Sequence, residues 1–177
     1  MSCTMINDRI IDDIDRKLLT ILQQNARTSN TDMARTVGLA PSAVLERVRK
    51  LEERKLIQGY GARVDPRPMG RGLLAFVSVR TEGRETGSQT ARRLAEIPEV
   101  QEVHNVAGDD CYLVKVRVAD TESLGRLLRE KVSALPNVSS TRTTIVLETL
   151  KETLAVPIEA SDHRNGTARK RPRGGKR

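Results

Sequence analysis

A short turn at residues 38–41 separates two amphipathic segments, and it limits the fold of this chain more than any other feature. Before the turn, Ser29 and Asp32 are spaced as the N-cap and third residue of a capping box, which opens a short helix that ends at Gly38. After the turn, Pro41 suits the first position of another helix, because its missing N–H would have no partner there. The pattern predicts a helix-turn-helix.

Apolar residues with helical spacing extend this motif on both sides. A first helix is predicted from Asp12 to near Asn25, with acidic residues in its first turn, where the helix dipole favours negative charge. The helix after the turn is predicted to end near Arg54, and residues 57–64 have the composition of a strand. We therefore expect residues 12–65 to form a winged-type helix-turn-helix domain. The face of its last helix that we expect to be buried comprises Val44, Leu45, Val48 and Leu51.

The last helix of a helix-turn-helix enters the major groove of DNA, and its first residues contact base edges. Arg47 is suited to bind guanine through two parallel hydrogen bonds, and Ser42 can donate to or accept from a base or a phosphate. The outward positions expected near the start of this helix are Ser42, Ala43, Glu46 and Arg47. The cations expected to bind phosphates, and so to set register and salt dependence, are Arg27, Arg35, Arg49, Lys50, Arg54 and Lys55.

A charged helix of this kind also occurs in bundles with a solvated face, which bind no DNA. The spacing of cap, turn and second helix favours DNA, and residues 27–55 contain seven basic and four acidic residues. The net charge of +8 is weaker evidence that the folded part binds DNA, because residues 161–177 contain seven basic residues and one acid and account for +6 of it. From about residue 159 the chain is expected to be a disordered basic tail, either a solvated extension or a source of sequence-independent DNA affinity.

The second half of the chain alternates apolar and polar residues as strands do, after a linker over residues 66–72. An apolar-Pro-x-Val pattern occurs at residues 97–100 and again at 135–138, where each copy ends a helical segment and opens a strand. Two β-α-β units in tandem predict a ferredoxin-like βαββαβ domain over residues 73–158, so the chain is expected to be α+β. Strands are predicted at 73–79, 100–107, 112–118 and 141–150, and helices at 86–96 and 121–135.

Several short motifs are spread over both halves of the chain between about Asp12 and Ile158. They include Ala34, Val37-Gly38-Leu39-Ala40-Pro41-Ser42-Ala43-Val44, Ile57-Gln58-Gly59-Tyr60, Val64-Asp65-Pro66, Pro98-Glu99-Val100, Val106-Ala107-Gly108-Asp109-Asp110-Cys111-Tyr112 and Thr141-Arg142-Thr143. With these motifs the chain resembles the Lrp/AsnC, or feast/famine, family of bacterial and archaeal transcriptional regulators. The resemblance implies dimers formed through the ferredoxin-like domain, their assembly into tetramers or octamers, and an amino-acid effector bound between dimers. It also implies a double-stranded DNA target that is a pseudo-palindromic operator.

The resemblance also implies where the effector binds. The family's effector loop matches at Gly108, Asp109 and Tyr112, whereas Cys111 stands where the family has a second acid, and Asp110 is the adjacent carboxylate. Residues at the ends of the second and fourth strands are expected to face the same cleft. The effector-binding residues implied are His104, Asn105, Gly108, Asp109, Asp110, Thr141, Thr143 and Thr144.

Other classes of protein fit the sequence less well. No Gly-rich phosphate loop, nucleophile elbow or paired-His motif is present, and His104 and His163 lack the cysteine pairs of a zinc site, so we expect no enzyme, cofactor or metal site. Two alternatives stay open: a sirohaem decarboxylase with the same two-domain layout, and an architectural DNA-bending protein without an effector. Residues 1–11 are expected to be a flexible leader. With two cysteines, no signal peptide and no long apolar run, the protein is expected in the cytoplasm, with no membrane partner.

Overall fold

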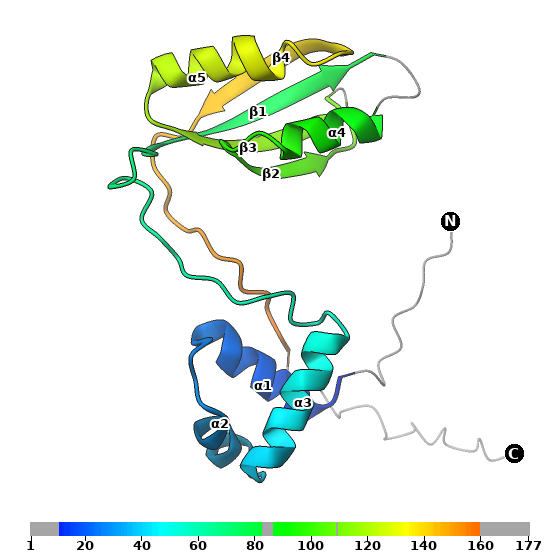
Figure 1. Ribbon diagram of the computed structural model, residues 1–177, viewed down its shortest axis with the longest axis vertical. Coiled ribbons are helices and arrows are strands. Elements are labelled where there is room, and N and C mark those ends of the chain that lie inside the picture. The colour runs from blue at the N-terminus through cyan, green and yellow to red at the C-terminus, as the bar shows by residue number, and fades with distance from the viewer. Residues whose placement is uncertain (1–10, 83–86, 109, 160–177) are drawn as a thin grey trace, which may run out of the picture. The chain divides into compact units, whose positions relative to one another are not determined.

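The computed structural model describes residues 11–82, 87–108 and 110–159, in two compact units (Figure 1). Of the described residues, 11–62 together with 153–159 make up one unit, and Arg63–Glu152 belong to the other. The expected second domain, residues 73–158, therefore differs from the observed unit, because the chain from Thr153 onward groups with the N-terminal helices. The expected leader and basic tail lie almost wholly outside the described residues.

Three helices build the first unit: α1 (Asp13–Gln24), α2 (Asn30–Val37) and α3 (Pro41–Glu53). Each presents one apolar face, as the sequence predicts, and together these faces form a small closed core. The buried residues of that core are Leu18, Leu22, Met33, Ala34, Val44 and Val48.

The ends of these helices are fixed by local hydrogen bonds. Ser29 caps α2 as predicted: its hydroxyl accepts from the N–H of Asp32 at 3.1 Å and donates to the Asp32 carboxylate at 2.6 Å. The capping box at the start of α1, between Asp12 and Asp15, was not predicted, although both acids were expected in its first turn. Ala40 contributes no side-chain cap to α3, so Pro41 and packing define where that helix begins.

Two expectations for this unit were wrong. Residues 57–64 form no strand: none of the described strands pairs with them, so no ladder is completed and the domain has no β-wing there. Leu45 was expected in the core, but 56% of its surface is exposed. Val44, Val48 and Leu51 fill the interior face of α3, which leaves Leu45 on the outer side.

Gly38 ends α2 in the left-handed conformation, with φ at 72°, and a β-carbon there would meet no atom within 4 Å. Changing Gly38 to Ala is therefore expected to lower the free energy of unfolding by about 1 kcal/mol through backbone conformation alone. Gly61→Ala is the matched control, since Gly61 also has open space but no positive φ, and should be neutral or slightly stabilising. Equal urea midpoints for the two variants would contradict this account of the turn.

The second unit has the predicted order of elements: β1 (Leu73–Thr81), α4 (Gly87–Ala95), β2 (Val100–Asn105), β3 (Tyr112–Val118), α5 (Thr121–Leu127) and β4 (Val138–Ile145). The strands pair antiparallel in the order β2-β3-β1-β4, which is the sheet of a ferredoxin-like fold. The last helix continues beyond α5 as a π-helical turn, η2 (Leu128–Val132).

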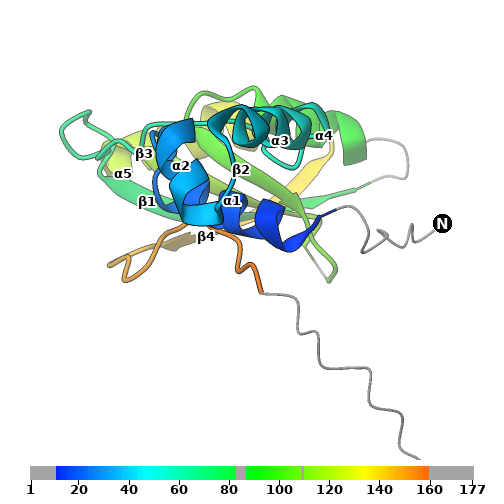
Figure 2. The same ribbon diagram turned by 90° about the horizontal axis from the view of Figure 1, so that it is seen from below.

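Residues of α4 and α5 pack on one face of this sheet (Figure 1; Figure 2). The core there joins Leu94 and Leu124 from the helices to valines of the two central strands, such as Val77 and Val114. The other face, which we call the open face, carries no helix of this unit among the described residues. Strand β4 begins at Val138 and ends at Ile145, not at 150 as expected. Ile145 pairs with Ala75, and the Val146 N–H still donates to the Leu74 carbonyl oxygen, but β1 begins at Leu73, so residues 148–150 would extend beyond its first residue.

Candidate DNA-binding surface and effector loop

The solvent side of α3 carries a continuous line of side chains with helical spacing. Ser42, Leu45, Glu46 and Arg49 are all exposed and lie at positions i, i+3, i+4 and i+7, which place them on one face of the helix. We call these four residues the outer stripe. Ala43 is exposed beside it. The outer stripe therefore presents an apolar, a hydroxyl, an acidic and a guanidinium group to any molecule that contacts this face.

Arg47 does not belong to the outer stripe, so the expectation that it points outward was wrong. Its Nη1 lies 2.7 Å from Asp12 Oδ2 and 2.8 Å from Asp15 Oδ1, and only 32% of its side chain is exposed. The guanidinium therefore ties α3 to the capping box at the start of α1, across 35 residues of sequence. The acids in the first turn of α1 were the sequence signal for this pairing, but the helix dipole also favours acids at that position, so the pairing was not predicted.

The contact between Asp12 and Arg47 shifts the pKa values of these two residues in opposite directions. Partial burial raises the pKa of Asp12, but hydrogen bonds from the Asp15 N–H and from Arg47 outweigh that effect and hold the pKa below its usual value. The hydrogen bonds to Asp12 and Asp15 raise the pKa of Arg47. The guanidinium of Arg47 therefore stays charged, and it bridges α3 to Asp12 as long as the Asp12 carboxyl is ionised.

Arg49 is the arginine that reaches the solvent on the outer stripe. It makes two long contacts, 3.4 Å to Glu46 and 3.3 Å to Glu53, and Lys50 lies 3.6 Å from Glu46. Exposed pairs of this kind contribute little stability, so these cations can exchange their partners at low cost. The other cations expected to meet phosphates, Arg27, Arg35, Arg54 and Lys55, are also exposed.

The sheet register shows how the expected effector residues are distributed. His104 pairs with Leu113, Leu113 with Ser78 and Ser78 with Arg142, and this row lies on the open face. The next row joins Asn105 to Thr141 through Tyr112 and Val79, and it lies on the face that the helices cover. The expected residues at the ends of β2 and β4 are therefore divided between both faces of the sheet.

The threonines of β4 follow the same alternation. Thr141 and Thr143 pair with Val79 and Val77 on the helix-covered face, whereas Thr144 pairs with Phe76 on the open face. The expectation that all three threonines face one cleft was wrong, because successive residues of a strand point to opposite sides.

The loop between β2 and β3 is held by three contacts from outside it. The carboxylate of Asp110 lies 2.6 Å from the guanidinium of Arg142 on β4. Asn105 donates its amide to the carbonyl oxygen of Cys111 at 3.2 Å, and the Cys111 N–H donates to the carbonyl oxygen of Val79 at 3.0 Å. Gly108 has a φ of 128°, which an L side chain rarely adopts, and Asp109 lies outside the described residues. Sequence reasoning missed Arg142 because its partner, Asp110, is 32 residues away.

Lys115 lies on the open face and binds two acids. Its amino group is 2.9 Å from Glu102, and it also pairs with Glu152, which in turn lies 3.2 Å from Arg117. Hydrogen bonds from Lys115 lower the pKa of both Glu102 and Glu152. A carboxyl whose pKa is lowered by folding stabilises the protein above its unfolded pKa and loses that contribution as the pH falls through its folded pKa.

Changing Lys115 to Met is therefore expected to cost about 1 to 2 kcal/mol at pH 7, and progressively less below about pH 4.5 as the two carboxyls become protonated. Urea unfolding at fixed protein concentration, repeated from pH 7 to pH 3, measures this. Arg126→Met is the control, because the pair of Arg126 with Glu122 is exposed and should be worth under about 0.5 kcal/mol. A loss at Lys115 that is the same at pH 7 and pH 3 would show that packing, not charge, is responsible.

The described ranges give no support for a membrane-spanning helix or for a metal site. None of the helices there combines the length and apolar character that a bilayer crossing requires. No group of three or more His, Cys, Asp or Glu residues is gathered there in a way that suits a metal ion.

Comparison with known families finds matches over both units. Residues 11–52 match the AsnC-type helix-turn-helix domain, and residues 74–156 match the Lrp/AsnC ligand binding domain. The two matches account for the three helices and for the whole sheet of the second unit.

Individual relatives match over most of their length. The leucine-responsive regulatory protein of Escherichia coli (strain K12) is 39% identical over 151 residues, which are 84% of this chain and 92% of that protein. The feast or famine regulatory protein of M. tuberculosis, solved with L-methionine, has a TM-score of 0.78 at 38% identity, over 84% of this chain and 99% of that one. A Neisseria meningitidis transcriptional regulator, solved with L-Met, has a TM-score of 0.78 at 26% identity, over 83% and 96% of the two chains.

Proposed function

Because this chain belongs to the Lrp/AsnC family of transcriptional regulators, we propose that it binds a specific DNA operator and that an amino acid controls this binding. The observation that carries the proposal is the outer stripe of α3, with its exposed guanidinium and the cations around it. The family consists of regulators rather than enzymes, so the sirohaem decarboxylase alternative is set aside. The proposed place of action is the cytoplasm, where chromosomal DNA lies.

We assign base reading to the outer stripe and phosphate binding to the cations beside it. The guanidinium of Arg49 suits the two acceptors of guanine, Leu45 suits the methyl group of thymine, and Ser42 suits either a base or a phosphate. The residues proposed to contact phosphates are Arg27, Arg35, Lys50, Arg54 and Lys55. Arg47, held by two carboxylates, orients α3 instead.

Selection of bound sequences from a random double-stranded DNA pool tests this assignment. A sequence-specific regulator enriches a pseudo-palindrome whose half-sites lie about 10 base pairs apart, one turn of DNA, or a multiple of that. An architectural protein that bends DNA without reading it would enrich no motif, and that result would refute the specific-regulator proposal.

The pseudo-palindrome requires a two-fold dimer, which we propose forms through the open face of the sheet. This face carries Phe76 and Leu113. The segment that follows β4 also exposes Leu147 and Leu150 almost completely, at 98% and 88%, and exposed apolar side chains of this size mark an interaction surface. Dimers would then assemble into tetramers or octamers, and sedimentation velocity measures the size of the assembly.

For the effector, we propose that Asp110 and Arg142 bind the two charged groups of a free amino acid. The guanidinium suits the carboxylate and the Asp110 carboxylate suits the ammonium group, and the relatives solved with methionine support an effector of this class. The other proposed contacts are His104 and Thr144, which share the open face with Arg142, and Gly108 and Asp109 of the loop. Asn105, Thr141 and Thr143 lie on the helix-covered face and are left out of this proposal. A thermal-shift screen of the twenty amino acids, with operator binding followed for every hit, identifies the effector; no shift with any of them would refute this part.

Changing Asp110 to Asn is expected to abolish the thermal shift caused by the effector and to leave effector-free operator binding within about twofold. The reason is that the variant keeps the shape of the loop but loses the charge that faces an ammonium group. Glu122→Gln, on the exposed surface of α5, removes an acid outside the loop and should keep the full shift. An undiminished shift in the Asp110 variant would place the effector elsewhere.

A further inference from the structure

Two arginines lie close together on the open face of the sheet, on the neighbouring strands β1 and β4 (Figure 1). Arg80 pairs with Ser140, and two residues along the strands Ser78 pairs with Arg142. All four residues therefore lie on the open face, where the two arginines occupy one diagonal of the pairing and the two serines the other. Long side chains at such diagonal positions can reach the same small molecule.

The β2–β3 loop adds a carboxylate to this pair of arginines. The Cys111 N–H donates to the carbonyl oxygen of Val79, the residue before Arg80, so the loop meets β1 beside that arginine. Asp110 is the acid among the described residues of the loop, and its carboxylate lies 2.6 Å from the guanidinium of Arg142. We call Arg80, Arg142 and Asp110 the arginine corner.

The charges of the arginine corner do not balance within the described part of the chain. Asp110 pairs with Arg142, whereas Arg80 is exposed and has neither an ion pair nor a side-chain hydrogen bond to another described residue. Two guanidinium groups on adjacent strands therefore share one carboxylate. Such an arrangement favours a ligand that brings further negative charge.

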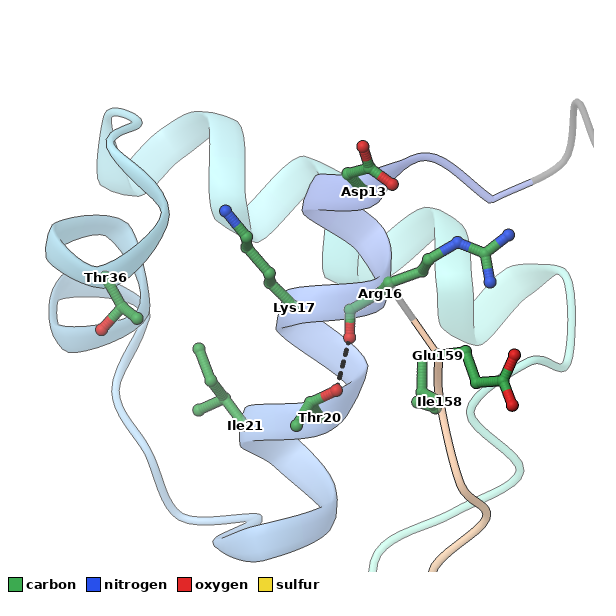
Figure 3. A pocket seen from close by; sticks show the side chains of 8 residues that line it. All are labelled: Asp13, Arg16, Lys17, Thr20, Ile21, Thr36, Ile158 and Glu159. Carbon is green, nitrogen blue, oxygen red and sulfur yellow. Dashed lines mark hydrogen bonds between the residues drawn. The ribbon is translucent and has the colours of Figure 1, made fainter. Parts of the chain in front are cut away.

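The helix-turn-helix unit offers a competing site, a cavity of about 480 Å³ between α1, α2 and the last described residues (Figure 3). Those residues are held to α1 by two hydrogen bonds between the backbone of Val156 and the side-chain amide of Gln23, at 2.6 and 3.1 Å. The buried Nε of Arg16 in this cavity has no hydrogen-bond partner among the described residues. The charged lining is nevertheless balanced, with two acids and two cations: Asp13, Glu159, Arg16 and Lys17.

We propose that the effector is an acidic amino acid, aspartate or glutamate, and that Arg80 selects it by binding the side-chain carboxylate. This inference rests on the proposed effector site at Asp110 and Arg142, to which it adds a specificity-determining residue. The ligand carries two carboxylates and one ammonium group, and the arginine corner offers two guanidinium groups and one carboxylate to match them. A neutral amino acid would leave the charge of Arg80 uncompensated beside Arg142.

Isothermal titration calorimetry of the full chain, near neutral pH and at constant ionic strength, compares the two acids with glutamine, asparagine, leucine and methionine. Each acid should bind at least about tenfold more tightly than its own amide, the effect of one hydrogen bond between charged groups. Equal binding of acid and amide, or tighter binding of leucine or methionine, would overturn the proposal.

Glutarate tests the ammonium group, because it has the two carboxylates of glutamate but no ammonium group to face Asp110. It should bind at least about tenfold more weakly than glutamate. Glutarate bound as tightly as glutamate would assign the arginine corner to dicarboxylates in general and overturn the amino-acid assignment.

Substitutions of Arg80 test its role directly. Arg80→Gln should lower the affinity for glutamate at least about tenfold and bring the preference over glutamine to within about threefold. Arg80→Glu places a carboxylate at the same position and should make the protein prefer lysine to glutamate. A preference for glutamate that survives Arg80→Gln would overturn the role of Arg80.

Two controls accompany these variants. Arg92→Gln removes another exposed arginine, on α4 at the opposite face of the sheet, and should keep the full preference for glutamate. Lys17→Gln removes a cation of the competing cavity and should keep it as well. Loss of the preference in the Lys17 variant would place the acidic effector in the helix-turn-helix unit and overturn the assignment.

The two ideas fail in different ways. If no amino acid binds, or if none that binds changes operator affinity, the effector part of the proposed function fails. If a neutral amino acid binds through Asp110 and controls the operator while the acids do not, the proposed function stands and only this inference fails.

Discussion

Replacing Arg47 with Ala is expected to lower the free energy of unfolding of the helix-turn-helix unit by about 2 kcal/mol, because it leaves two neighbouring carboxylates without their shared cation. The Asp15 side chain is only 12% exposed, so water cannot fully replace the lost guanidinium. For a unit of this size the loss corresponds to a fall in melting temperature of roughly 8 to 15 °C. Circular dichroism at 222 nm follows the change.

A second substitution separates charge from packing at this site. In the Arg47→Ala background, Asp15→Asn should recover at least half of the loss, because it removes the uncompensated charge; in the natural background the same change should destabilise the protein. Full stability of Arg47→Ala together with loss of operator recognition would show instead that Arg47 turns outward to read a base.

Replacing Arg49 with Ala is expected to weaken operator binding by about 10-fold to 100-fold, the effect of losing one bidentate contact to guanine. Binding to random DNA should fall only a few-fold, so the specificity ratio falls. The unfolding free energy should change by less than about 0.5 kcal/mol, since Arg49 is exposed and its ion pairs are long.

Lys50→Ala is the matched control for Arg49, because both residues are exposed cations near Glu46 and differ in whether they lie on the outer stripe. It should weaken the binding of operator and of random DNA by the same factor, and reduce the slope of log K against log salt by about 1. Equal effects of the two substitutions on the specificity ratio would mean that the outer stripe is not the base-reading face. The Arg47 and Arg49 results together separate a residue that holds α3 in place from one that touches DNA.

Local rules in the sequence were enough to predict most of the fold. The capping residue Ser29, the glycine at position 38 and the proline at 41 fixed the turn, and alternation predicted all four strands. The strand bounds that were wrong depended on pairing. Strand β4 cannot run to residue 150, because β1 begins at Leu73, and residues 57–64 form no strand because none of the described strands pairs with them.

The candidate sites were harder to predict, because they depend on contacts between distant residues. Helical spacing alone does not tell which of two neighbouring helix faces is covered, so Leu45 was expected in the core and Arg47 in the solvent. In the structure Leu45 is exposed, and Arg47 is turned toward Asp12 and Asp15. The pairs Asp110–Arg142 and Gln23–Val156 join segments 32 and 133 residues apart. By contrast, the threonines of β4 were expected to face one cleft although strand alternation already places Thr144 on the opposite face from Thr141 and Thr143.

The central claim, that this protein recognises a particular DNA sequence, is tested most directly by one affinity ratio. Fluorescence anisotropy at physiological salt gives the dissociation constants of the full chain for the operator obtained by selection and for a scrambled duplex of the same length and composition. The account predicts that the operator is bound at least about 10³-fold more tightly. Equal affinity for the two duplexes would contradict it.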